Sequence, residues 1–340
     1  MSARAHTGSV DALSPASVVP RVSVVLPVWN GAAFLEEAIA SVLAQTLSEF
    51  ELLIMDDGSS DESAVIALEL AATDARVRVI QLARVGIAAA LNTGIRLARA
   101  QYIARMDSDD ISLPPRLQRQ VEYLDLHPSC VVVGSDAEVI DREGRCIGRT
   151  QVPYTHDGIR RKLIAGYGGA LVHPAVMMRK DAVVAVGGYR AYRSPSEDRD
   201  LWVRLIEVGQ IVNLPETLLR YRRHHNSIGS RERVPLMRAS TAIINESRRQ
   251  QGLPTLRPRF NQSERDALAA YHAECARIAL QSGRRWQALR HARASIAAAP
   301  LWLQPYASIA ACALPTGLVA SLIRAGGWLR TLRLPVWANR

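Results

Sequence analysis

The sequence predicts an α/β fold, in which a mostly parallel sheet carries helices on both faces, followed by an α-helical C-terminal region. Short apolar runs rich in β-branched residues, typical of buried strands, occur at residues 21–28, 50–55, 77–82 and 102–106. Segments with helical spacing or helix-capping residues lie between these runs, at 34–46, from 60 onward and at 87–100. Strands that alternate with helices imply crossover units and a parallel sheet.

The pattern continues less regularly toward residue 230. Helices are expected at residues 116–126, 156–165 and 199–208, and strands at 130–134, 175–178 and 218–221. A hairpin turn is expected near 141–144 and a glycine-rich loop at 166–169. We therefore expect a disordered polar segment over residues 1–20, one α/β domain over 21–230 and a helical region over 231–340.

Composition places the chain among globular proteins and narrows its partners. Of its 340 residues, 48% are hydrophobic and 22% are charged. The four cysteines form no CxxC pair, which argues against a zinc site or a disulfide framework and suits a reducing compartment. The net charge of +10 favours anionic partners. An aromatic content of 5%, with no run of basic and aromatic residues together, argues against nucleic acid.

The C-terminal region carries three predictions. Residues 268–299, with Gly283 at a turn and Pro300 at the end, predict a helical hairpin similar to one tetratricopeptide unit. Residues 294–323 contain no charge, but prolines interrupt them, so a membrane span is the less favoured interpretation. Residues 318–340 combine Leu, Ile and Trp with arginines, which fits a helix at an anionic membrane surface or a basic tail packed on its own domain.

An acidic turn follows the strand expected at 102–106. Asp107, Asp109 and Asp110 are separated only by Ser108, with no basic residue among them. Carboxylates this close repel one another unless a cation lies between them, and hard divalent cations prefer oxygen ligands. The alternative is a solvated acidic loop that caps the next helix. The surrounding residues must decide between the two.

Three other segments supply polar or aromatic groups that could surround this turn. Two of these segments follow the first and second expected strands, and the third precedes the helix expected at 199. Their residues of interest are Pro27, Trp29, Asn30, Asp56, Asp57, Glu197 and Asp198. The carboxyl ends of parallel strands meet at one edge of a sheet, which is where ligands bind in α/β folds. We therefore expect these segments to share one ligand with the acidic turn.

Taken together, the sequence resembles the inverting glycosyltransferases of family 2, which have the Rossmann-like GT-A fold. The resemblance is carried, in this order, by VSVVLPVWNGAAFLEEAIASVLAQT (22–46), FELLIMDDGSSDES (50–63), ARMDSDDISLPPRLQRQV (104–121), HPAVMMRK (173–180), GGY (187–189), SEDRDLWVRL (196–205) and LLRYRRHHNS (218–227). Trp29 departs from the family, in which tyrosine is usual. The indole keeps a face for base stacking but lacks the phenol hydroxyl.

The resemblance implies a nucleotide-sugar site. The side chains it places around the base and ribose are Pro27, Trp29, Asn30 and Glu36, and Asp56 or Asp57 is implied at the uracil ring. Asp107, Ser108 and Asp109 are implied at the ribose and the metal–diphosphate group. Because several carboxylates would repel a diphosphate, Mg²⁺ or Mn²⁺ is the expected cofactor, held by Asp107 and Asp109.

The segment at 218–227 implies two further roles. Arg220 or Arg222 is expected to offset phosphate charge. His224 is expected to bind the metal or to contact phosphate, and a purely structural role for this histidine is an equal alternative.

Asp198 is the expected general base. Inversion in one displacement needs a group opposite the leaving diphosphate that takes the proton of the acceptor hydroxyl. In the family this role belongs to the aspartate of the Glu-Asp pair, and Glu197 would orient the acceptor or a neighbouring residue. The alternative for Glu197 and Asp198 is that they only neutralise the dipole at a helix N-terminus.

We therefore expect a metal-dependent, hexosyltransferase-type enzyme that moves a sugar from a nucleotide-diphosphate donor, with UDP as the expected nucleotide, to a saccharide or lipid-linked acceptor. The expected process is the assembly of a cell-surface polysaccharide or glycolipid. The expected location of the enzyme is the cytoplasm, with peripheral contact to the anionic inner face of the membrane. One alternative is a sugar nucleotidyltransferase, but the segment after the first strand lacks that class's glycine-rich loop and lysine. Another is a non-catalytic sugar- or lipid-binding module, which would be expected to have lost Asp107, Asp109 or Asp198. A nucleotide-hydrolysing P-loop protein is excluded because GxxxxGK[ST] is absent.

Overall fold

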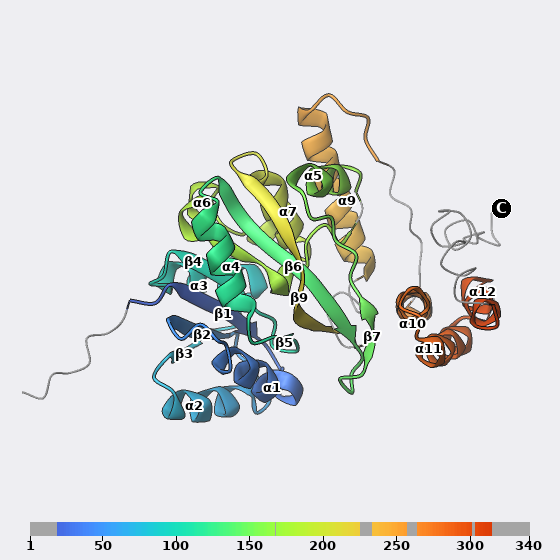
Figure 1. The fold of residues 1–340 in the computed structure, drawn as a ribbon, viewed down its shortest axis with the longest axis horizontal. Coiled ribbons are helices and arrows are strands. Elements are labelled where there is room, and N and C mark those ends of the chain that lie inside the picture. Colours follow the sequence, from blue (N-terminus) through green and yellow to red (C-terminus); the bar gives the residue numbers. More distant parts are fainter. Residues whose placement is uncertain (1–18, 167, 225–232, 257–263, 301–302, 315–340) are drawn as a thin grey trace, which may run out of the picture.

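One mixed sheet organises the computed structural model, which describes residues 19–166, 168–224, 233–256, 264–300 and 303–314 (Figure 1). Within these residues, nine strands pair in the order β3-β2-β1-β4-β8-β6-β9-β5, and β7 pairs with β6. The strands are β1 (Val22–Val28), β2 (Phe50–Asp56), β3 (Val77–Gln81), β4 (Tyr102–Arg105), β5 (Ile111–Ser112), β6 (Cys130–Ile140), β7 (Cys146–Arg149), β8 (Met177–Arg179) and β9 (Gln210–Arg222). The predicted α/β class is confirmed.

The parallel half of the sheet forms as predicted. β1 pairs in parallel with β2 and with β4, and β2 pairs in parallel with β3. Every residue of β1 and β2 is buried, which explains why these strands are continuously apolar in sequence. Along β1, Val24 and Leu26 pack into the core on one face and Val25 into the core on the other. The carboxyl ends of β1, β2 and β4 consequently meet at one edge.

The other half has longer strands than the sequence predicts. β8 is antiparallel to both β4 and β6, and β9 is parallel to β6, so β4, β6 and β9 run in the same direction. Strands were expected only at 130–134 and 218–221, but β6 extends to Ile140 and β9 begins at Gln210. Polar residues interrupt the apolar pattern of both strands. Register shifts around Asp136 accommodate the interruption without ending the pairing.

In the described part of the chain, seven α-helices flank the sheet. They are α1 (Ala32–Leu43), α2 (Ser63–Thr73), α3 (Ile87–Leu97), α4 (Arg116–Leu126), α5 (His156–Ile164), α6 (Lys180–Ala185) and α7 (Glu197–Leu205). Helices α1, α2 and α4 contribute to the core on one face, and α3, α5, α6 and α7 to the core on the other. The sequence predicts that Glu197 and Asp198 precede the helix expected at 199–208. This prediction is wrong, because α7 begins at Glu197 and both carboxylates lie in its first turn. Short 3₁₀ turns cover His173–Ala175, part of an expected strand, and Ala191–Arg193.

Four more helices follow, α9 (Arg233–Gln250), α10 (Glu264–Gln281), α11 (Arg285–Ala298) and α12 (Leu303–Cys312). Helix α9 lies against α5 and α7, whereas α10 to α12 gather beside β7 (Figure 1). Helices α10 and α11 form the predicted hairpin, and Gly283 turns between them with a φ of +71°. Ile278 of α10 packs with Val139 and Ile147 of the β6–β7 hairpin. A Cβ at Gly148 would lie 2.3 Å from Ile278 Cγ2, so this glycine permits the close packing of helix on hairpin.

Two predictions lie mainly outside the described residues: the disordered segment at 1–20 and the basic apolar segment at 318–340. Within the described residues, the uncharged segment 294–323 is divided between the end of α11 and α12. No helix in the described part of the chain is both long and apolar enough to cross a membrane.

Candidate active site

The turns after β1, β2 and β4 lie together, as predicted. The backbone N–H of Asn30 donates to Ser59 Oγ (3.0 Å), and Asn30 Oδ1 accepts from the backbone N–H of Ser60 (2.8 Å). These bonds fasten the turn after β1 to the turn after β2. An added Cβ at Gly31 would lie 3.0 Å from Ser108 Oγ, so the first turn also touches the acidic turn.

Asp57 holds the loop after β3 beside an exposed indole. The buried carboxylate of Asp57 accepts hydrogen bonds from Arg84 Nη1 (2.7 Å) and from the backbone N–H groups of Val85 (2.6 Å) and Gly86 (2.9 Å). The guanidinium of Arg84 lies 3.7 Å from the ring centroid of Trp29, which is 45% exposed. Arg84 was not predicted as a site residue. The only sign of it in the sequence was that it is a basic residue shortly after the third expected strand.

The other residues expected around the nucleotide differ in exposure. Pro27 is buried within β1, and Asp56 is buried with Oδ1 accepting from the backbone N–H of Ser59 (3.1 Å), which closes its own turn. Glu36 is exposed on α1 and makes no hydrogen bond or ion pair with the described chain. The structure therefore gives Asp56 a turn-forming contact and leaves Glu36 open to solvent.

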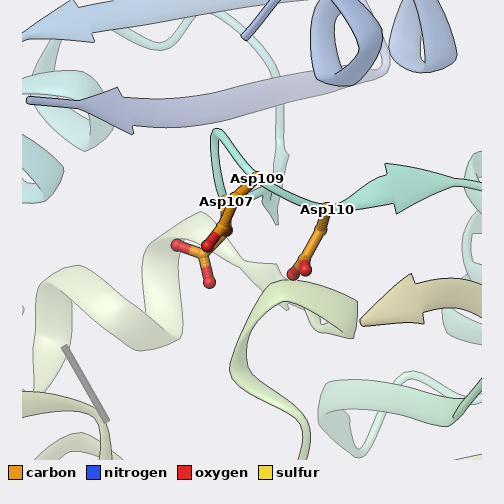
Figure 2. A group of neighbouring side chains, drawn as sticks. All are labelled: Asp107, Asp109 and Asp110. Atoms are coloured by element: carbon orange, nitrogen blue, oxygen red, sulfur yellow. The ribbon is translucent and has the colours of Figure 1, made fainter. Parts of the chain in front are cut away.

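The acidic turn forms a tight cluster. Oxygens of Asp107, Asp109 and Asp110 lie within 4.8 Å of one another. Figure 2 shows the three side chains extending from the same turn. Asp110 is only 1% exposed. Its Oδ1 accepts from the backbone N–H of Arg222 (2.7 Å), and its buried Oδ2 has no hydrogen-bond partner among the described residues. Burial, followed by the charges of Asp109 and Asp107, raises the pKa of Asp110 well above its usual value.

A small hard cation fits this donor set. The three carboxylates repel one another, and one of them, Asp110, has a buried oxygen without a partner in the described chain. A bound Mg²⁺ or Mn²⁺ would relieve the repulsion and give that oxygen a partner. Asp110 was recognised as part of the acidic turn but was not predicted as a ligand. Its burial, which the sequence did not reveal, makes Asp110 a candidate metal ligand together with Asp107 and Asp109.

Arg105 balances part of the negative charge. This buried side chain at the end of β4 forms an ion pair with Asp107 through Nη1. Burial raises the pKa of Asp107, Arg105 opposes that effect, and the charge of Asp198 adds to it. Asp198 is therefore within electrostatic reach of the acidic turn. Arg105 was not predicted, although a charged residue inside an apolar strand was a visible signal.

His224 and Arg222 reach the acidic turn from the end of β9. His224 Nε2 lies 2.9 Å from Asp109 Oδ2, and its ring lies 5.3 Å from the ring of Phe34. Arg222 is 3% exposed. Its Nε donates to the carbonyl oxygen of Asp109 (2.8 Å), and its Nη2 donates to Glu37. The guanidinium thus anchors the acidic turn, a role that the sequence did not predict.

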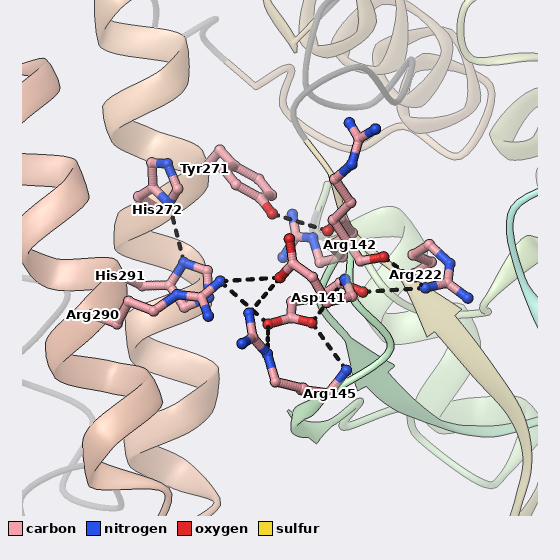
Figure 3. A network of polar contacts seen from close by, with 10 residues as sticks. Asp141, Arg142, Arg145, Arg222, Tyr271, His272, Arg290 and His291 are labelled. Carbon is pink, nitrogen blue, oxygen red and sulfur yellow. Dashed lines mark hydrogen bonds and ion pairs between the residues drawn. The ribbon is translucent and has the colours of Figure 1, made fainter. Parts of the chain in front are cut away.

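This anchor continues into the C-terminal helices (Figure 3). Arg222 Nη1 donates to the carbonyl oxygen of Arg142 (2.9 Å) in the β6–β7 turn. In the same turn, the Asp141 carboxylate accepts from Arg145 Nε (2.9 Å) and lies 3.3 Å from Nη2 of Arg290 on α11. Polar contacts therefore connect α11 to the acidic turn through one hairpin.

The Glu-Asp pair occupies two different environments. Glu197 is 7% exposed, and its Oε2 is buried without a hydrogen-bond partner in the described chain. Burial, followed by the charge of Asp198, raises the pKa of Glu197 to about 7. Asp198 is more exposed, and its Oδ1 accepts from the backbone N–H of Arg199 (2.6 Å).

An aromatic and imidazole group supports this helix. His173 Nε2 lies 2.8 Å from the hydroxyl of Tyr189, and the His173 ring meets Trp202 of α7 edge-on at 5.6 Å. Burial, followed by the charge of Arg105, keeps the pKa of His173 well below its usual value. A neutral imidazole therefore packs against the helix that carries Asp198. Tyr189 was noticed only as part of the GGY motif.

The chain is similar to known glycosyltransferases. Residues 23–187 match the family model described as Glycosyl transferase family 2. The putative glycosyltransferase EpsE of Bacillus subtilis is 37% identical over 208 residues, which cover 60% of this chain and 73% of that protein. The O-antigen biosynthesis glycosyltransferase WbnJ of Escherichia coli is 33% identical over 214 residues, which cover 62% and 82%.

Solved structures extend the likeness to the fold. TarS 1–349 of S. aureus in complex with UDP superposes with a TM-score of 0.54 at 16% identity, covering 91% of this chain and 92% of that one. The mannosyltransferase PcManGT of Pyrobaculum calidifontis, in complex with GDP-Man and Mn²⁺, gives 0.51 at 18% identity, covering 93% and 88%. The fold is that of the GT-A glycosyltransferases. On the strength of its close relatives, the chain belongs to glycosyltransferase family 2.

Proposed function

We propose that this glycosyltransferase moves a hexose, with inversion, from a UDP-linked donor to a hydroxyl of a saccharide or lipid-linked acceptor. The observation that carries the proposal is that the turns after β1, β2 and β4 lie together, and these turns carry the exposed ring of Trp29 and the acidic cluster. The charge of Asp198 acts on Asp107, which supports a position for Asp198 near the same cluster. WbnJ is named for O-antigen biosynthesis, which supports a role in cell-surface polysaccharide assembly. The net charge of +10 supports action at the cytoplasmic face of an anionic membrane.

The nucleotide is proposed to lie beside Trp29. Its exposed indole offers a stacking face, and Arg84 beside it adds positive charge. A carboxylate offers about four acceptor positions, and Asp57 uses three within the described chain, which leaves one for the uracil N–H. Pro27, Asn30 and Glu36 are proposed to flank the base and ribose.

The metal is proposed to be Mg²⁺ or Mn²⁺, held by Asp107, Asp109 and Asp110, with His224 beside Asp109. When bound, the cation supplies charge that binds the diphosphate and stabilises it as a leaving group. The chain's own contribution is to hold the acidic turn rigidly through Arg222 and to offset its charge through Arg105.

Asp198 is proposed as the general base. The acceptor oxygen attacks the anomeric carbon as the bond to the diphosphate breaks, and the proton of the acceptor hydroxyl passes to the Asp198 carboxylate. One feature favours Asp198 over its neighbour. Asp198 is the more exposed of the two, whereas the carboxylate of Glu197 is buried.

A donor panel tests the proposal. Purified protein is incubated with UDP-Glc, UDP-Gal, UDP-GlcNAc, UDP-GalNAc, GDP-mannose and a dTDP-sugar, with Mn²⁺, with Mg²⁺ or with EDTA, and slow release of free nucleotide is measured. We expect at least one UDP-sugar to be hydrolysed only with metal. Hydrolysis unaffected by EDTA, or no binding and no hydrolysis of any donor, would contradict the proposal.

A further inference from the structure

One cation next to the proposed base has no partner among the residues that the structure describes. Arg199 lies in the first turn of α7, directly after Asp198, and its side chain is partly buried. None of its guanidinium nitrogens makes a hydrogen bond or ion pair with the described residues. Other partly buried arginines of this region are paired, as Arg193 is with Glu246 and Arg204 with Asp200.

An unpaired guanidinium in this position is costly. Burial lowers the pKa of Arg199, which means that its surroundings disfavour the charge, and the nearby Asp198 only opposes that effect. Burying a charge without a partner costs free energy, and a bound anion would remove the cost. The guanidinium offers planar, paired donors that match the oxygens of a phosphate or carboxylate.

The glycine-rich loop lies against this guanidinium. Arg199 Nη2 is 3.4 Å from the position that a Cβ would take at Gly168, and both Gly168 and Gly169 are exposed. At the next glycine of the loop, Lys162 Nζ donates to the carbonyl oxygens of Gln151 (2.9 Å) and Gly169 (2.8 Å). Two cations thus flank two exposed glycines, whose lack of side chains lets a ligand approach the backbone.

We propose that Arg199, with Lys162 and the Gly168-Gly169 backbone, forms a subsite for an anionic group, a phosphate or a carboxylate, that the acceptor carries. The inference rests on the proposed function, in which Asp198 takes a proton from the acceptor hydroxyl, so that the neighbouring Arg199 is close to the rest of the acceptor. It goes further by assigning the acceptor a negative charge. The two sources of that charge are a lipid phosphate and an acidic sugar.

Binding of two probes to metal-free protein tests the subsite. EDTA removes divalent cations, so the carboxylates of the acidic turn repel anionic probes. Any binding of a probe therefore reports on a cationic site elsewhere in the protein. Geranyl phosphate represents a lipid phosphate and methyl glucuronide an acidic sugar, and their affinities are measured by titration calorimetry at low ionic strength. We expect wild-type protein to bind one of them, Arg199→Gln to lose about tenfold or more in affinity, and Arg199→Lys to lose less. The probe that binds identifies the source of the charge.

A matched control separates this effect from general charge. Arg161 is exposed on α5, near the same loop, and its side chain makes no hydrogen bond or ion pair with the described chain, so Arg161→Gln removes one positive charge without touching the subsite. We expect it to bind the probe as wild type does. Thermal melting of each variant verifies that it is folded. Equal affinities of Arg199→Gln and wild type, or no binding of either probe to wild type, would overturn the inference.

The outcomes also distinguish this inference from the proposed function. If wild-type protein hydrolyses a UDP-sugar with Mn²⁺ but anion binding does not depend on Arg199, only the subsite is wrong. If anion binding depends on Arg199 but no donor is bound or hydrolysed, the proposed function is wrong and an anion site remains.

Discussion

Arg222 Nε donates to the main-chain carbonyl of Asp109 across 2.8 Å and so joins the end of β9 to the acidic turn after β4. The backbone N–H of Arg222 also donates to Asp110 Oδ1 (2.7 Å). Two consecutive residues of the acidic turn are therefore fixed by one arginine far away in the sequence. Supporting contacts of this kind hold metal ligands in position and tune their affinity.

Replacing Arg222 tests this support. Arg222→Lys keeps the charge but loses the fork of donors that reaches Asp109, Arg142 and Glu37 at once, so we expect Mn²⁺ affinity to fall about 10- to 100-fold. Titration of the protein with Mn²⁺, followed by electron paramagnetic resonance, measures this directly. Arg220→Lys is the control, because Arg220 is half-exposed and pairs only with Glu138. Unchanged Mn²⁺ affinity in folded Arg222→Lys would show that the contact does not support the metal site.

Replacing Asp110 tests whether its buried oxygen faces a cation. Asp110→Asn removes a buried charge that burial and two neighbouring carboxylates disfavour, so the metal-free variant is expected to melt higher than wild type at pH 8. The same change removes a ligand, so Mn²⁺ should raise the melting temperature of the variant less than that of wild type. The measurement is thermal melting with Mn²⁺ or EDTA. An equal Mn²⁺-dependent shift in both proteins would exclude Asp110 as a ligand.

Glu197 predicts a pH dependence of stability. Its pKa is raised from 4.5 to about 7, so the folded state holds this proton more tightly than the unfolded state does. Stability is therefore highest below pH 4.5, falls as the pH rises from 4.5 to 7, and above pH 7 stays lower than its acid value by an amount on the order of 3 kcal/mol. Glu197→Gln should gain stability relative to wild type as pH rises from 5 to 8. Denaturant unfolding at both pH values measures the difference, and a constant difference would refute the raised pKa.

Asp198→Asn tests the general base. The variant keeps the size of the side chain but cannot accept a proton, so we expect turnover to fall about 100- to 10,000-fold. Donor binding should persist, because the residues proposed to hold the nucleotide and metal are unchanged. Donor hydrolysis and calorimetric binding of UDP with Mn²⁺ separate the two effects. Glu207→Gln, at a half-exposed ion pair with Arg160, is the control. Normal turnover of Asp198→Asn would end its assignment as the base.

The sequence predicts the parallel half of the fold well because β1 and β2 are buried on both faces and therefore read as continuous apolar runs. It predicts β6 and β9 poorly, because their pairing tolerates polar residues through register shifts that only the partner strand reveals. The acidic turn and the Glu-Asp pair are visible as local motifs. Asp110 and Arg222 gain their roles from burial and from a contact between segments far apart in the chain, which no local pattern encodes. Arg105 was visible as a charge inside an apolar strand, but its burial beside Asp107 was not.

The contact between Gly148 and Ile278 makes the C-terminal helices a structural brace for the α/β domain. Cutting the chain before α10 would strip the cover from Val139 and Ile147 and deprive the buried Asp141 of Arg290. Both losses affect the β6–β7 hairpin, in which the carbonyl oxygen of Arg142 accepts a hydrogen bond from Arg222. A shortened protein that ends after α9 would thus be weakened at the place from which its acidic turn is held.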